Sequence, residues 1–104
     1  MSAAKRILIV EDEIMIALHM EDTLAELGHS IVTAATASEA SALLAREEID
    51  LAILDYHLRD GTSDQIATRL QELDVPFILC SGTAGIEELG EVFRNRPVLA
   101  KPFT

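Results

Sequence analysis

Four short apolar runs constrain the fold of this chain most, because each of them ends in a charged or polar side chain. The runs are 7–10, 51–54, 77–80 and 98–100. The side chains that follow them are Glu11 and Asp12, Asp55, Ser81, and Lys101. In an open α/β sheet, ligands bind outside the carboxyl ends of the strands. We therefore expect three carboxylates, one hydroxyl and one amine to converge on a single pocket.

Helical patterns alternate with extended segments along the whole chain. The clearest helix has apolar residues at helical spacing from Ile14 and stops at Gly28. Thr36, followed three residues later by Glu39, is a capping-box pattern that predicts the start of a second helix. The remaining expected elements are an extended segment at 30–34, a helix after the loop 60–63 and a weak helix candidate at 84–93. This alternation predicts an α/β fold with one parallel sheet and right-handed crossovers.

Composition narrows the classes of protein to which the chain can belong. Its 104 residues are enough for one domain, which we expect to span 1–104. Eight Lys and Arg against 18 Asp and Glu give a formal net charge of −10, which speaks against direct binding to nucleic acid. The only cysteine, Cys80, lies in an apolar run and is expected to be buried. No stretch approaches the roughly 18 apolar residues of a membrane span, so we expect a cytoplasmic location and no membrane partner.

The three carboxylates predict the chemistry of the pocket. Glu11, Asp12 and Asp55 would repel one another, and a hard divalent cation with oxygen ligands is the simplest way to make the cluster tolerable. Mg²⁺ is the natural candidate, because it needs only one or two protein carboxylates and often completes its coordination with phosphate oxygens. Carboxylates also form aspartyl-phosphate intermediates, so Asp55 is a candidate nucleophile, with Lys101 as counter-charge and Ser81 as hydroxyl donor.

Four motifs in this order carry a resemblance to a known family. They are Ile7-Leu8-Ile9-Val10-Glu11-Asp12-Glu13, Asp55-Tyr56-His57-Leu58-Arg59-Asp60-Gly61, Ser81-Gly82 and Lys101-Pro102-Phe103. Over essentially its whole length the chain resembles a response-regulator receiver domain of two-component signalling. The resemblance implies a flavodoxin-like, doubly wound parallel sheet of five strands in the order 2-1-3-4-5.

The same resemblance implies roles for individual residues. Asp55 would accept a phosphoryl group from a histidine kinase or phosphotransfer protein. Asp12 would bind Mg²⁺ directly, Glu11 mostly through water, and the backbone carbonyl of His57 would complete the protein's share of the site. Ser81 would turn toward the phosphoryl group and Lys101 would pair with it. Three positions would tune access to that group and its lifetime: His57, Gly82 and Thr83.

The chain departs from the family pattern in two places. Receiver domains usually end in a fifth helix after the Lys-Pro motif, and this sequence stops at Thr104. We expect the missing helix to leave part of one sheet face uncovered, and the chain to dimerise or pack on a partner there unless the sequence is a shortened piece. Val98 stands where many relatives carry an aromatic ring or His, so signalling through a ring that swings inward is in doubt.

The favoured interpretation is a phosphoacceptor that signals to an unknown downstream protein. It is not an enzyme beyond its own phosphorylation and dephosphorylation. Two rival interpretations remain. A phosphatase of the haloacid dehalogenase type also uses a strand-end Asp, but needs a second acid two residues later, where this chain has His57. The other rival is a receiver-like interaction or dimerisation module that works without phosphorylation. The missing fifth helix keeps that reading open.

Overall fold

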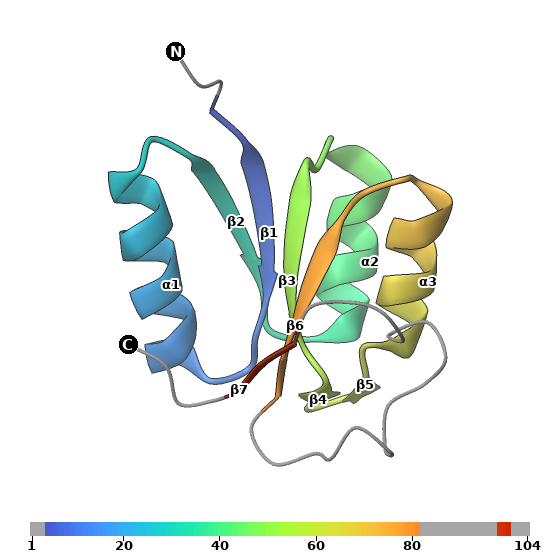
Figure 1. The fold of residues 1–104 in the computed structure, drawn as a ribbon. Helices are drawn as coiled ribbons and strands as arrows, with labels where there is room; N and C mark the ends of the chain where they lie inside the picture. Colours follow the sequence, from blue (N-terminus) through green and yellow to red (C-terminus); the bar gives the residue numbers. More distant parts are fainter. Residues whose placement is uncertain (1–3, 82–97, 101–104) are drawn as a thin grey trace.

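The structure is a computed structural model that describes residues 4–81 and 98–100, with the side chains of 81 and 98–100 left aside. Three helices and seven strands follow one another along this part of the chain (Figure 1). They are β1 (Arg6–Val10), α1 (Ile14–Glu26), β2 (Ser30–Ala34), α2 (Ala37–Arg46), β3 (Leu51–Asp55), β4 (His57–Leu58), β5 (Gly61–Thr62), α3 (Asp64–Glu72), β6 (Phe77–Ser81) and β7 (Val98–Ala100).

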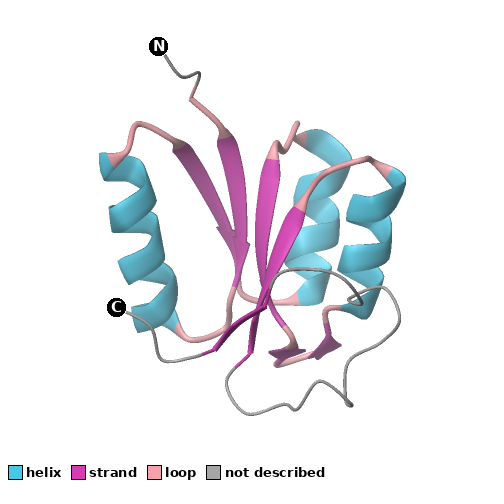
Figure 2. Ribbon diagram, viewed as in Figure 1, coloured by secondary structure: helices cyan, strands magenta, loops and turns pink. Residues whose placement is uncertain are grey.

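Five of the strands form one parallel sheet. Its order is β2-β1-β3-β6-β7, which is 2-1-3-4-5 when only the strands of this sheet are counted, so the predicted order is confirmed. Helix α1 covers one face, and α2 and α3 cover the other (Figures 1 and 2). The expected doubly wound, flavodoxin-like architecture is therefore present. None of the helices in the described ranges has the length and apolar character needed to cross a membrane.

Alternation along β1 divides the core into two clusters, one on each side of the sheet. Ile7 and Ile9 pack with Met20 on the α1 side, and all three are buried. Leu8 and Val10 point to the other side and belong to the larger cluster. Because successive side chains of a strand lie on opposite faces of the sheet, a run that is apolar at every position needs a covering layer on both faces. The two helical layers provide that cover.

Two local signals in the sequence set helix ends. The Thr36 hydroxyl accepts a hydrogen bond from the Glu39 amide at 3.1 Å, so α2 begins where the capping-box pattern predicts. Gly28 follows α1 with φ +94°, a conformation that suits glycine, and its amide donates to the Ala25 carbonyl at 2.9 Å. The end of α1 therefore sets where the chain turns back into β2, and the start of α2 sets where the chain leaves β2.

One element was not predicted. The expected loop after β3 contains a two-stranded antiparallel sheet, in which His57 pairs with Thr62 and Leu58 with Gly61. These strands are too short to show a period-two pattern, so hydrophobic periodicity could not reveal them. The helix candidate at 84–93 and the expectation about a fifth helix fall outside the described residues.

The inward face of α3 provides a test of the larger cluster. Leu70 is fully buried, whereas Leu73, one turn later, is 41% exposed. We expect Leu70→Ala to lower the free energy of unfolding by about 2–5 kcal/mol, because it opens a cavity in a packed core. Urea unfolding followed by circular dichroism measures the loss.

Leu73→Ala, at the residue that directly follows α3, is the matched control, and we expect it to cost less than about 1 kcal/mol. Equal losses in the two variants would contradict the assignment of Leu70 to the core.

Candidate functional site

Three carboxylates meet at the carboxyl edge of the sheet. Glu11 and Asp12 follow β1, and Asp55 ends β3, which pairs with β1 in parallel register. One carboxylate oxygen from each residue lies within 4.8 Å of those of the other two. Glu11 is 3% exposed and Asp55 is 8% exposed, while Asp12 is half-buried. The predicted convergence of these three side chains is therefore what the structure contains.

The cluster places like charges close together in a partly dry site. Two carboxylates about 4–5 Å apart repel by a few kcal/mol at an effective dielectric constant of about 20. Glu11 is held by its own loop, since its Oε2 accepts a hydrogen bond from the Glu13 amide at 3.1 Å, and its amide donates to the Ala34 carbonyl at 2.9 Å. These two hydrogen bonds help to hold Glu11 beside the other carboxylates.

The donor set fits a hard divalent cation. Oxygens bound to one octahedral Mg²⁺ at about 2.1 Å lie between about 3 and 4.2 Å apart. Carboxylate oxygens already within 4.8 Å of one another need only small side-chain shifts to reach that geometry. Glu11, Asp12 and Asp55 are the side chains that would hold such an ion.

The sheet register brings Ser81 to the same edge. Asp55 pairs with Cys80 on β6, so Ser81 lies one residue beyond the partner of Asp55. Ser81 in turn pairs with Ala100, the last residue of β7. Lys101 comes next in the sequence and, like Gly82 and Thr83, falls outside the described residues. The predicted backbone position of Ser81 is thus present, and the roles of these four residues stay predictions.

His57 stands two residues beyond Asp55, at the start of β4. Its side chain is exposed, and its ring meets the Tyr56 ring edge-on with centroids 4.9 Å apart. Tyr56 is buried, and its hydroxyl donates to Asp64 at 3.2 Å, which ties the segment after β3 to the start of α3. The roles predicted for His57, in metal binding through its carbonyl and in tuning, remain predictions.

Asp60 has a structural role near the cluster that was not predicted from the sequence. It lies in the turn between β4 and β5, and its two carboxylate oxygens accept hydrogen bonds from the amides of Ala37 and Ser38 at 2.9 and 3.1 Å. These amides belong to the first turn of α2, where the helix dipole also favours a negative charge. The hydrogen bond from Ala37 is the largest cause of a lowered pKa at Asp60. The hairpin beside Asp55 is therefore anchored on α2.

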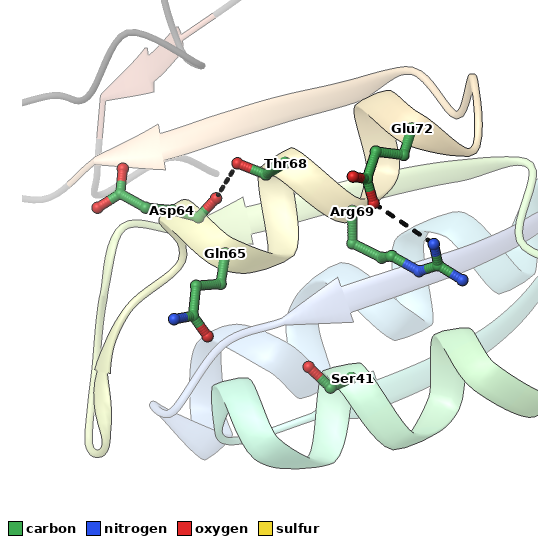
Figure 3. A pocket seen from close by; sticks show the side chains of 6 residues that line it. All are labelled: Ser41, Asp64, Gln65, Thr68, Arg69 and Glu72. Carbon is green, nitrogen blue, oxygen red and sulfur yellow. Dashed lines mark hydrogen bonds and ion pairs between the residues drawn. The ribbon is translucent and has the colours of Figure 1, made fainter.

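A hollow between α2 and α3 is lined by none of the three clustered carboxylates (Figure 3). It has a volume of about 400 Å³ and is lined by Ser41, Asp64, Gln65, Thr68, Arg69 and Glu72. Arg69 pairs with Glu72 at 3.4 Å, and Asp64 accepts hydrogen bonds from Tyr56 and Thr62. Among the described residues, Glu11, Asp12 and Asp55 form the group of carboxylates close enough to share a cation, so we assign the chemistry to that cluster and not to this hollow.

Comparisons with known proteins agree with the geometry. The profile of the response regulator receiver domain family matches residues 7–104. The Phyllosphere-induced regulator PhyR of Methylorubrum extorquens is 32% identical over 104 residues, which cover 96% of this chain and 39% of that protein. The chain spans between 36% and 43% of the length of the curated relatives it matches.

Solved structures include similar folds at higher identity. The solution structure of SdrG from Sphingomonas melonis Fr1 has a TM-score of 0.84 and 44% identity, covering 100% of this chain and 89% of that chain. A BeF3-activated conformation of SdrG has a TM-score of 0.79 at the same identity and coverage. The receiver domain of PhyR from Erythrobacter litoralis has a TM-score of 0.81 and 36% identity, covering 98% of this chain and 81% of that chain.

The anchor at Asp60 predicts a pH dependence of stability. Its pKa is lowered in the folded state, so its contribution is present above the unfolded value of about 3.9 and is lost as pH falls through the folded value. We expect Asp60→Asn to lower the melting temperature at pH 7, and the difference from the native chain to vanish at low pH. Thermal unfolding between pH 2 and pH 7 measures this.

Asp22→Asn, at an exposed position on α1, is the control for the loss of one carboxylate. A difference between Asp60→Asn and the native chain that does not change with pH would argue against the anchor.

Proposed function

We propose that this chain, which belongs to the response regulator receiver domain family, accepts a phosphoryl group on Asp55 in a reaction that requires Mg²⁺. The observation that carries the proposal is the meeting of Glu11, Asp12 and Asp55 within 4.8 Å at the carboxyl edge of the sheet. Of the three, Asp55 is the one that ends a central strand and lies beside the position of Ser81. This position supports our proposal that Asp55 serves both as a ligand and as a nucleophile.

The reaction asks this chain mainly for position and charge. An oxygen of Asp55 attacks phosphorus in line with the departing nitrogen of a phosphohistidine, so that the P–O bond forms as the P–N bond breaks and the imidazole returns to the donor protein. Bound Mg²⁺ would neutralise charge on the transferring oxygens. Asp12 and Glu11 would hold the ion, Ser81 would donate a hydrogen bond to a phosphoryl oxygen, and Lys101 would balance the charge of the product.

The partners follow from this chemistry. The donor is a histidine kinase or a phosphotransfer protein, and the phosphorylated chain changes its affinity for a downstream protein. We expect no turnover of an external substrate beyond the chain's own phosphorylation and dephosphorylation. The phosphoryl group acts by shifting a two-state equilibrium, because it bonds its neighbours differently in each state.

Labelling with a small phosphodonor tests the nucleophile directly. We expect acetyl phosphate with Mg²⁺ to add one phosphoryl group per chain, and Asp55→Asn to abolish the addition, because an amide oxygen is a poor nucleophile. Intact-protein mass spectrometry, with loss of the label in alkaline hydroxylamine, identifies an acyl phosphate.

The control for the loss of a carboxylate is again Asp22→Asn, which we expect to be labelled like the native chain. If the native chain takes no label from active donors, or Asp55→Asn labels as well as it does, Asp55 is not the acceptor and a phosphorylation-independent interaction module becomes the better account.

Mg²⁺ binding is a separate prediction that needs no phosphodonor. At about one hundred times its dissociation constant, the ion should stabilise the fold by about 2.7 kcal/mol. We expect Asp12→Asn to raise the melting temperature in EDTA, since one member of a repelling cluster is neutralised, and to lose most of the Mg²⁺-dependent increase. Thermal unfolding with and without Mg²⁺ measures both effects.

Asp22→Asn should keep the full increase with Mg²⁺. An increase of equal size in Asp12→Asn would place the ion somewhere other than the carboxylate cluster.

A further inference from the structure

The turn of the β4–β5 hairpin reaches across to the loop that follows β1. The Arg59 guanidinium donates a hydrogen bond through Nη2 to the backbone carbonyl of Asp12 at 3.2 Å, across 47 positions of sequence. Asp12 carries one of the three clustered carboxylates. The guanidinium therefore contacts the backbone of a residue that belongs to the acidic cluster.

The turn that carries Arg59 is anchored at its backbone. Asp60, the next residue, is held by the two amides at the start of α2, and Leu58 pairs with Gly61 across the turn. Arg59 thus extends from a turn that is anchored on one side by α2 and on the other by the strand pairing. A side chain on an anchored turn loses less entropy when it makes a contact than one on a free loop.

Arg59 also differs in position from the other Lys and Arg residues within 4–81. Those residues belong to segments at the amino edge of the sheet. They are Lys5 and Arg6 at the start of β1, Arg46 at the end of α2 and Arg69 in the last turn of α3. Helices that connect parallel strands run back from the carboxyl edge, so their last turns lie far from it (Figure 1).

We propose that Arg59 is an internal counter-cation of the cluster formed by Glu11, Asp12 and Asp55. It stabilises the metal-free state by offsetting the repulsion among the carboxylates and, for the same reason, lowers their affinity for a divalent cation. Arg59 is a positioning residue and takes no part in bond making. The proposal rests on the metal site proposed above. It adds a residue of this chain that sets the Mg²⁺ concentration needed to occupy that site.

The direction of the effect separates a counter-cation from a simple tether. A tether that only held the Asp12 loop in place would weaken Mg²⁺ binding when removed. A positive charge several ångströms from a divalent ion opposes its binding, so its removal should strengthen binding by about two- to fivefold at moderate ionic strength. The difference in Mg²⁺ affinity between the two chains should become smaller as salt is added, because exposed charges are screened.

The experiment is a titration of the intact chain with Mg²⁺ alone, followed by amide chemical shifts or by calorimetry. We expect Arg59→Gln to bind Mg²⁺ about two- to fivefold more tightly than the native chain, and to have a lower melting temperature in EDTA. Arg59→Lys keeps the charge, so its affinity should stay within about twofold of the native value. Because Arg59 makes its contact at the exposed surface, these variants should fold.

Arg69→Gln is the matched control, since it removes the same charge at an exposed position on α3. It should leave the affinity for Mg²⁺ unchanged. Equal or weaker binding by Arg59→Gln, with normal binding by the native chain, would overturn the counter-cation and leave the metal site standing. No saturable binding by the native chain would overturn both.

Discussion

Holding three carboxylates within 4.8 Å of one another costs electrostatic free energy, and the rest of the fold has to offset that cost. The parallel register of β1 and β3 keeps the backbones that carry Glu11, Asp12 and Asp55 side by side in the centre of the sheet. Apolar side chains above and below those strands stabilise the pairing. The core therefore has a role beyond stability, since it fixes the backbone positions from which the three carboxylates converge.

The small hairpin after β3 connects this cluster to the helical layer behind it. Its turn contacts the Asp12 loop through Arg59 and the start of α2 through Asp60. The first strand of this hairpin begins only two residues after Asp55, so a change of charge at Asp55 would act close to both of these contacts. Mechanical coupling over such a distance needs no long pathway of side chains, because the backbone itself is continuous from Asp55 to Asp60.

Much of this architecture could be predicted from the sequence, for physical reasons that differ between elements. A strand buried on both faces must be apolar at every position, so the runs before Glu11 and Asp55 were readable, and their place at one sheet edge followed from parallel pairing. The capping-box pattern at Thr36 predicted the start of α2. The contacts of Arg59 and Asp60 were not, because they join segments more than 20 positions apart and depend on how the turn is aimed. Local sequence patterns carry no information of that kind.

The pairing of Asp55 with Cys80 has a practical consequence. Cys80 is the only cysteine in the chain, is 1% exposed and lies opposite Asp55 on the neighbouring strand. A thiol reagent can reach it only when β6 separates from its neighbours or the covering layer opens, so the rate of thiol modification measures how often the centre of the sheet opens. The chain thus carries a native chemical probe beside Asp55, which reports opening of the sheet without any engineered label.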